Sequence, residues 1–121
     1  MASHIKEGQG WRLGWNSDAT VFKGLVGGDR WALEMTTAEF EDFCRLTLQL
    51  TDTLQAMAAE LMDEERIACE QETERIWVEV EGYPKAYSLR FILLSGRKAE
   101  GGWPAASTSE FVQVIPGLTF F

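Results

Sequence analysis

The sequence predicts an α+β fold of two halves, each a β-meander followed by a helix. An antiparallel sheet packs on one long amphipathic helix and one short C-terminal helix. Short segments in both halves alternate apolar and polar residues, as half-buried strands do. A run with helical spacing follows in each half. A short internal repeat supports these two halves, since Trp31 precedes Thr37–Phe40 and Trp103 precedes Thr108–Phe111.

The first half begins with three strand-like segments. Residues 11–15 alternate apolar and polar side chains, which predicts a half-buried strand. Residues 21–26 and 31–35 flank the Gly-Gly-Asp-Arg sequence at 27–30, a turn whose residues accept positive φ. With this turn as the loop, the expected pairs are Val26 with Trp31, Gly24 with Leu33, Phe22 with Met35 and Lys23 with Glu34.

A long helix is predicted from Thr37 to Met62. Thr36 and Glu39 fit a capping box at its start, and apolar residues then recur every three or four positions. Twenty-six residues would span about 39 Å, whereas a compact chain of this size has a radius of gyration of about 14 Å. One end of the apolar stripe would then need cover from a second subunit, so we expect a homodimer.

The second half predicts a three-stranded antiparallel meander over 67–73, 75–81 and 87–94. Matching the apolar faces sets the pairs, and a turn at Glu74 and Arg75 places Glu70 beside Glu79. We expect Arg90 to hold both carboxylates on a solvated face that Trp77 shares. The expected pairs are Val80 with Leu89, Val78 with Phe91, Glu79 with Arg90 and Glu70 with Glu79.

The C-terminal part is ambiguous between a helix and a strand at 107–115. Its β-branched residues favour a strand, whereas a second capping box at Ser107–Glu110 favours a helix. We choose the helix, ending before Pro116. The apolar tail at 118–121 must either pack on the fold or form an interaction surface.

Length and composition favour one domain over residues 1–121, with half-repeats at 10–62 and 66–116. The longest apolar run, Phe91–Leu94, is far too short to cross a membrane. The N-terminus has no apolar leader, so we expect a cytoplasmic protein. Its two cysteines would stay reduced as small buried hydrophobes.

Nothing in the sequence indicates a catalytic, metal or cofactor site. His4 is the only histidine and lies in a terminus that we expect to fray, which disfavours a triad or a conventional zinc site. The glycines match neither the dinucleotide nor the phosphate-loop motif. Glu70 and Glu79 are the only carboxylate couple considered for acid–base work, and no pocket is evident around them. We therefore expect a protein that is not an enzyme and binds no cofactor.

A candidate interaction surface comes from the loop at 95–103 and the solvated sheet face. The loop combines cations, an aromatic residue and glycines, so it suits an anion, a nucleobase or a partner's carboxylate, unless it is only a flexible hairpin loop. Trp77 is a candidate contact anchor. The residues of this surface are Arg97, Lys98, Trp103, Trp77, Arg90, Glu79 and Glu70.

Several strings together resemble a small cyanobacterial family, the domain-of-unknown-function family 1818. They cover most of the chain: Gly10–Trp15, Leu25–Gly28, Trp31–Glu34, Glu60–Glu65, Glu81–Pro84 and Gly96–Trp103. The resemblance implies a fold similar to whirly- and PC4-type single-stranded-DNA-binding regulators. It implies no activity and no catalytic residues, and fold alone does not assign nucleic-acid binding.

Three functions are therefore compatible with the sequence. The first is a non-enzymatic, dimeric protein-interaction or regulatory module with an unknown protein partner. The second is a single-stranded nucleic-acid binder, which a basic groove would favour but the net charge of −8 disfavours. The third is a carboxylate enzyme, which would need a deep pocket at Glu70 and Glu79. In the second, the expected phosphate contacts are Arg12, Lys23, Arg90, Arg97 and Lys98.

Overall fold

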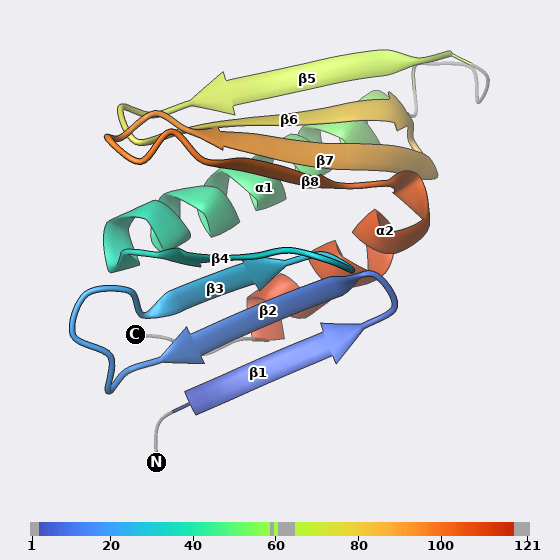
Figure 1. Cartoon of the computed structure of the whole chain (residues 1–121). Helices are drawn as coiled ribbons and strands as arrows, with labels where there is room; N and C mark the ends of the chain where they lie inside the picture. Colours follow the sequence, from blue (N-terminus) through green and yellow to red (C-terminus); the bar gives the residue numbers. More distant parts are fainter. Residues whose placement is uncertain (1–2, 59, 61–64, 118–121) are drawn as a thin grey trace.

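The described part of the chain forms two four-stranded antiparallel sheets and two α-helices, so the α+β prediction is confirmed (Figure 1). The computed structural model describes residues 3–58, 60 and 65–117. Four strands precede each helix, in the sheet orders β1-β2-β3-β4 and β5-β6-β7-β8. The elements are β1 Ser3–Gly8, β2 Trp11–Asn16, β3 Gly24–Gly27, β4 Ala32–Met35, α1 Thr37–Met57, β5 Ile67–Glu72, β6 Ile76–Tyr83, β7 Ala86–Leu93, β8 Glu100–Trp103, α2 Ala105–Val114 and a 3-10 turn at Ile115–Gly117.

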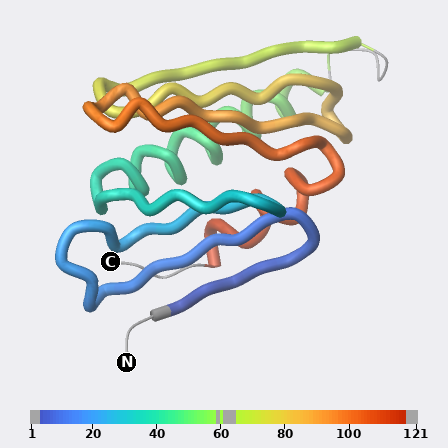
Figure 2. The backbone as a smooth tube through the Cα atoms, viewed as in Figure 1, coloured from blue at the N-terminus to red at the C-terminus, as the bar shows by residue number. Residues whose placement is uncertain are grey.

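Both helices lie on one side of the two sheets, and the opposite face of each sheet carries no helix (Figure 1). The path of the chain in Figure 2 shows that the first sheet and α1 are complete before the second sheet begins. Each sheet therefore has an inner face against the helices and an open outer face. The boundaries that we gave to the two half-repeats stay a prediction.

The N-terminus is a strand, so the prediction that it frays was wrong. Residues 3–8 pair in register with β2, where His4 lies opposite Trp15. The side chains of residues 4–8 are all exposed, so this edge strand is held by its backbone ladder. A strand exposed on both faces carries no alternation of apolar residues, and that is why its sequence gave no signal.

The β3–β4 hairpin is shifted by two residues from the predicted register. Its loop is residues 28–31, closed by a hydrogen bond of 3.0 Å from the Gly28 amide to the Trp31 carbonyl. Trp31 leaves the hairpin because its ring packs on Trp103 and Phe91 of the second half. An even shift keeps every side chain on its expected face. The observed pairs are Gly24 with Met35, Leu25 with Glu34, Val26 with Leu33 and Gly27 with Ala32.

The capping box of α1 is confirmed. The Thr36 hydroxyl accepts from the Glu39 amide at 3.2 Å, and the Glu39 carboxylate accepts from the Thr36 amide at 2.9 Å. The helix ends at Met57, five residues before the predicted end, with Ala58 as its C-cap. Residues 59 and 61–64 lie outside the described residues.

The apolar stripe of α1 is buried within a single chain as far as Leu54. The 21 residues of the helix span about 32 Å rather than the expected 39 Å. Among the described residues, the helix surface that was the reason for expecting a second subunit is thus covered as far as Leu54. The homodimer itself stays a prediction, and it needs a different surface.

The register of the second meander is confirmed at every predicted pair. Glu79 lies opposite Glu70 on one side and Arg90 on the other, and Val80 faces Leu89. The segment expected as a long loop contains a further strand, β8, which pairs with β7. Gly101 and Gly102 interrupt the alternation of apolar and polar side chains, so the sequence pattern does not predict this strand. A side chain at Gly101 would meet the Trp31 ring at 2.5 Å.

The C-terminal segment is a helix, as chosen, but it starts earlier than predicted. Pro104 is the N-cap and makes no side-chain cap, so the expected capping box at Ser107–Glu110 was wrong. The Glu110 carboxylate instead accepts from Trp11 Nε1 at 2.8 Å. α2 ends at Val114, before Pro116 as predicted. The tail at 118–121 lies outside the described residues.

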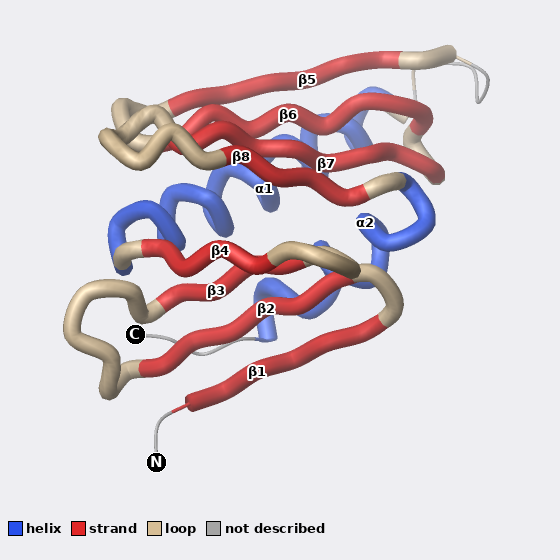
Figure 3. The backbone as a smooth tube through the Cα atoms, viewed as in Figure 1, coloured by secondary structure: helices blue, strands red, loops and turns tan. Residues whose placement is uncertain are grey.

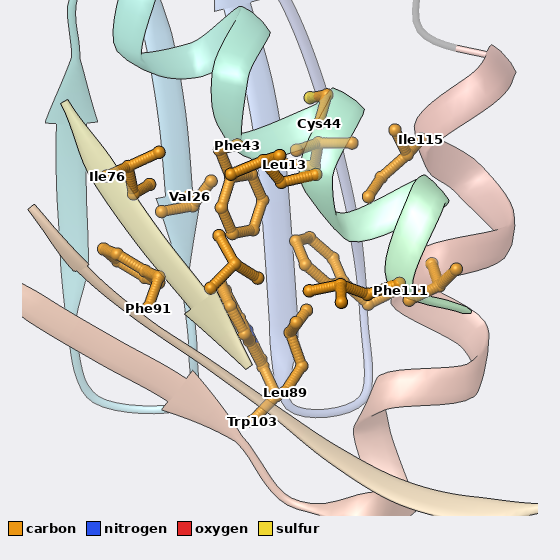
Figure 4. Packing of buried hydrophobic residues seen from close by; sticks show 14 of the residues in the cluster. Leu13, Val26, Phe43, Cys44, Ile76, Leu89, Phe91, Trp103, Phe111 and Ile115 are labelled. Carbon is orange, nitrogen blue, oxygen red and sulfur yellow. The ribbon is translucent and has the colours of Figure 1, made fainter. Parts of the chain in front are cut away.

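Aromatic rings join the two halves in one hydrophobic cluster (Figure 4). The ring centroid of Phe43 lies 5.4 Å from that of Phe91 and 5.8 Å from that of Trp103. Trp103 also stacks on Phe111 at 4.4 Å. Cys44 belongs to this cluster, and burial raises the pKa of its thiol to about 12. Its thiol therefore stays protonated and packs as a small hydrophobic group, as expected, whereas Cys69 is only partly buried.

Candidate functional site

The outer face of the second sheet gathers four of the predicted surface residues. On β6, Ile76, Val78 and Val80 are fully buried, so they face the helices and the alternate residues point outward. Figure 3 shows the strands of this sheet in red, with α1 in blue behind them. We call this surface the Trp77 face. Its two central cross-strand rows are Glu72, Trp77, Ile92 and Glu100, and Glu70, Glu79, Arg90 and Gly102.

Arg90 and Trp77 form the centre of the face. The Arg90 Nε donates to Glu79 at 2.7 Å, and the guanidinium carbon lies 5.0 Å from the centre of the Trp77 ring. Trp77 Nε1 donates to Glu70 at 3.1 Å. The prediction that Arg90 holds both carboxylates was therefore right for Glu79 and wrong for Glu70. The indole lies diagonally across from Glu70, so Trp77 rather than Arg90 donates to this carboxylate.

The charge of the Trp77 face is negative. Glutamates at 70, 72, 79, 81 and 100 stand against Arg66 and Arg90, which gives a net charge of −3. The hydrogen bond and the charge of Glu79 raise the pKa of Arg90, so this guanidinium stays charged. Among the described residues, Glu72 and Glu100 form no salt bridge, although the charge of Glu100 contributes to the raised pKa of Arg90. The row through Trp77 thus has an apolar centre and a carboxylate at each end.

The other predicted surface residues lie elsewhere. Trp103 is 2% exposed and donates from Nε1 to the Gly27 carbonyl at 2.8 Å, so it cannot line a surface. Arg97 donates to the Glu34 carbonyl at 2.7 Å and lies over the Phe22 ring. Lys98 is exposed at φ +53° in the turn before β8. The loop is therefore fixed to the first half of the chain.

Glu39 is a buried charge that the sequence identified only as a helix cap. Its carboxylate accepts from the Ser95 hydroxyl at 2.7 Å and forms an ion pair with Arg97. Burial alone would raise the pKa of Glu39, but the Thr36 amide, the Ser95 hydroxyl and Arg97 together lower it. Both partners at 95 and 97 are distant in sequence, so no local pattern indicates them.

Two surface hollows were not predicted. One, of about 160 Å³, lies over Gly14 on the outer face of the first sheet. The other, of about 410 Å³, lies between α1, the β6–β7 turn and α2, where Asp52, Lys85 and Tyr87 line it. Burial raises the pKa of Tyr87. Neither hollow reaches Glu70 or Glu79, the couple considered for acid–base chemistry.

Most of the cations considered for phosphate binding already have acceptors within the protein. Arg12 donates to the Trp31 carbonyl at 3.0 Å, and Lys23 donates to two loop carbonyls at 2.8 and 2.9 Å. Arg90 and Arg97 pair with glutamates, as described above. Within residues 3–58, 60 and 65–117, no three His, Cys, Asp or Glu side chains are placed to hold a metal ion. The same residues include no helix long and apolar enough to span a membrane.

Comparisons with known proteins confirm the family that the sequence resembles, and the likeness to whirly- and PC4-type folds stays a prediction. A family model described as "Domain of unknown function (DUF1818)" matches residues 6–118. The chain is also similar to a crystal structure from Prochlorococcus sp. NATL2A, described as a protein with unknown function from the DUF155 family. The two share 30% sequence identity at a TM-score of 0.88, over 94% of this chain and 97% of that one. No curated protein matches the chain.

Proposed function

The chain belongs to the DUF1818 family, and from this premise we propose that it is a non-enzymatic protein-interaction module. Its Trp77 face binds a positively charged, extended segment of a partner protein. The observation that supports this proposal is the row Glu72, Trp77, Ile92 and Glu100, an apolar centre between two carboxylates that form no salt bridge among the described residues.

Trp77 supplies the contact area of the proposed interface. Its side chain is partly exposed on a sheet face that no helix covers, and tryptophan is among the residues that contribute most to protein interfaces. Arg90 already lies over this ring while pairing with Glu79. A partner's lysine or arginine would repeat that arrangement, with the alkyl chain on the indole and the cation on Glu72 or Glu100.

The spacing of the two carboxylates defines the partner sequence. Glu72 and Glu100 lie on the outermost strands, β5 and β8, three strand spacings or about 14 Å apart at about 4.8 Å per strand. An extended segment advances about 3.3 Å per residue, so basic residues at positions i and i+4 match this span. A leucine or another apolar residue at i+2 then meets Trp77 and Ile92.

Phosphate binding at the same face is opposed by charge. A net charge of −3 repels a nucleic-acid backbone, whose binding depends on clustered Lys and Arg. Arg12 and Arg97 have acceptors within the chain, which leaves them poorly available for phosphates. These features favour a basic protein segment over single-stranded DNA or RNA.

Calorimetric titration with a nine-residue peptide tests the proposal. The peptide carries lysines four residues apart and a central leucine, and a control peptide carries glutamines in place of the lysines. We expect a Kd of about 10–100 μM for the basic peptide, weakened at least about tenfold when Glu72 and Glu100 are both changed to Gln.

Glu41→Gln is the matched control variant, since Glu41 is an exposed carboxylate on α1, away from this face. It should bind the basic peptide as the wild type does. Equal binding of both peptides, or no heat with either at about 1 mM, would contradict the proposal. Saturable binding of oligo-dT or oligo-U in place of the peptide would instead support the nucleic-acid function.

A further inference from the structure

We propose that the outer face of the first sheet is the contact surface for a second copy of this chain. In the dimer, Ile5 of each copy enters the hollow over Gly14 of the other. This inference is independent of the Trp77 face, which lies on the other sheet. It places the expected homodimer on a sheet face rather than on the helix.

The hollow is a direct consequence of a glycine in the second strand. Gly14 lies between Ile5 on β1 and Leu25 on β3 in one cross-strand row, and it has no side chain to fill the outer face. The loop after β2 closes one end with Phe22. The result is a depression of about 160 Å³ whose lining mixes apolar side chains with Lys23 and Glu34.

A matching projection stands beside the hollow. Ile5 is 60% exposed, the largest exposure among the large apolar side chains that the structure describes. Its Cγ1 would lie 3.2 Å from a Cβ at Gly14, so Ile5 forms one wall of the hollow and leaves the rest of its side chain exposed. A two-fold axis brings the same surface of each copy together, so a projection next to a hollow makes the surface self-complementary.

Charge supports a second copy as the occupant. Lys23 and Glu34 both line the hollow. The Lys23 ammonium donates two of its three N–H groups to loop carbonyls, so a two-fold contact can set the third against the glutamate of the other copy. Glu7 and Arg12 add one charge of each sign to the same face, whose net charge is zero. The Trp77 face, at −3, would repel its own copy. Charge thus assigns self-association to the first sheet and a basic partner to the second.

Sedimentation velocity of the full chain, over a range of concentrations, tests the dimer. We expect a reversible monomer–dimer equilibrium in the micromolar range, and Ile5→Asp should raise its Kd at least about tenfold. Leu94→Asp is the matched control, because Leu94 is 45% exposed at the end of the second sheet. It should leave the Kd within about twofold. Circular dichroism should show equal melting of both variants, since both side chains are largely exposed.

A charge-reversal variant tests whether the outer face of the first sheet forms the dimer contact. Glu34→Lys places a lysine against the partner's Lys23, so we expect it to weaken the dimer at low salt and to match the wild type at about 0.5 M salt. A wild type that stays monomeric at about 0.5 mM would overturn the proposal. A dimer unaffected by Ile5→Asp would also overturn it. A dimer unaffected by Glu34→Lys at low salt would indicate edge pairing of β1 instead, and would overturn the face-to-face contact.

Discussion

The side chain of Glu39 connects the start of α1 to the loop before β8. It caps α1 through the Thr36 amide, and it meets Ser95 and Arg97 of the loop before β8. Its side chain is 6% exposed, so these partners take the place of nearly all the water that would otherwise hydrate the carboxylate. A buried carboxylate held in this way stabilises the fold only while it is charged.

We expect Glu39→Gln to lower the free energy of unfolding by about 1–2 kcal/mol at pH 7, because Arg97 loses its ion pair. The pKa of Glu39 is lowered from 4.5, so its contribution is present above about pH 4.5 and is lost as the pH falls through the lower, folded-state pKa. Urea unfolding at pH 7 and pH 3 measures this. The difference between wild type and variant should shrink at pH 3, and a difference independent of pH would contradict the assignment.

Thr47 carries the one buried side-chain oxygen without a hydrogen-bond partner in the described part of the chain. Its side chain is fully buried on α1. A hydroxyl without a partner is costly in the core, so Thr47→Val should raise the free energy of unfolding by about 1 kcal/mol. Thermal and urea unfolding measure the change. A loss of stability would show that the hydroxyl has a partner, such as a buried water.

At the scale of elements, apolar alternation decides which strands the sequence can predict. Ile76, Val78 and Val80 fix the face of β6, and the register of β5, β6 and β7 follows from it. β1 is exposed on both faces and β8 contains two glycines, so neither has this signal. The β3–β4 register depends on Trp31, whose ring packs against the second half of the chain. Packing between residues distant in sequence leaves no signal in the local sequence pattern.

Strand register also explains which surface residues were predicted correctly and which were not. Trp77, Glu79, Arg90 and Glu70 meet because register alone brings them together. Trp103 and Arg97 are fixed by Gly27 and Glu39 in the first half, contacts that no spacing within the loop reveals. Local register therefore predicted the Trp77 face, and tertiary contacts removed the loop from it.

The close contact of β8 with Trp31 gives a prediction for this element. A Cβ at Gly101 would lie 2.5 Å from the Trp31 ring and 3.0 Å from Phe91, so Gly101→Ala must move one of two core rings. We expect a loss of about 1–3 kcal/mol in the free energy of unfolding. Gly96→Ala, where a Cβ would meet nothing within 4 Å, is the matched control and should change stability little. Equal effects of the two variants in urea unfolding would contradict this packing.

At the scale of the whole molecule, two similar sheets have different outer faces. The face of the first is neutral, with Ile5 beside the hollow over Gly14. The face of the second is acidic around Trp77 and Arg90. Since the helices cover only the inner faces, both outer faces are open at once (Figure 1). A dimer formed through the first sheet would therefore carry two Trp77 faces for partners.

A dimer with two sites gives a prediction at this scale. A partner chain with two basic segments should bind the wild type more tightly than Ile5→Asp, because the second contact becomes intramolecular. A single-segment peptide should bind both proteins equally, since the variant leaves the Trp77 face intact. Calorimetric titrations with one-segment and two-segment peptides compare the two. Equal gains in both proteins would contradict a dimeric module.

NMR mapping of peptide contacts on the ¹⁵N-labelled chain tests the Trp77 face most directly. On addition of the basic peptide, we expect the indole N–H signal of Trp77, identified by its loss in Trp77→Phe, to shift together with the Nε–H of Arg90. The indole signals of Trp11, Trp15 and Trp103 should stay in place, because these rings are at most 6% exposed in the core. Shifts confined to other surfaces, or no shift under saturating peptide, would contradict the account.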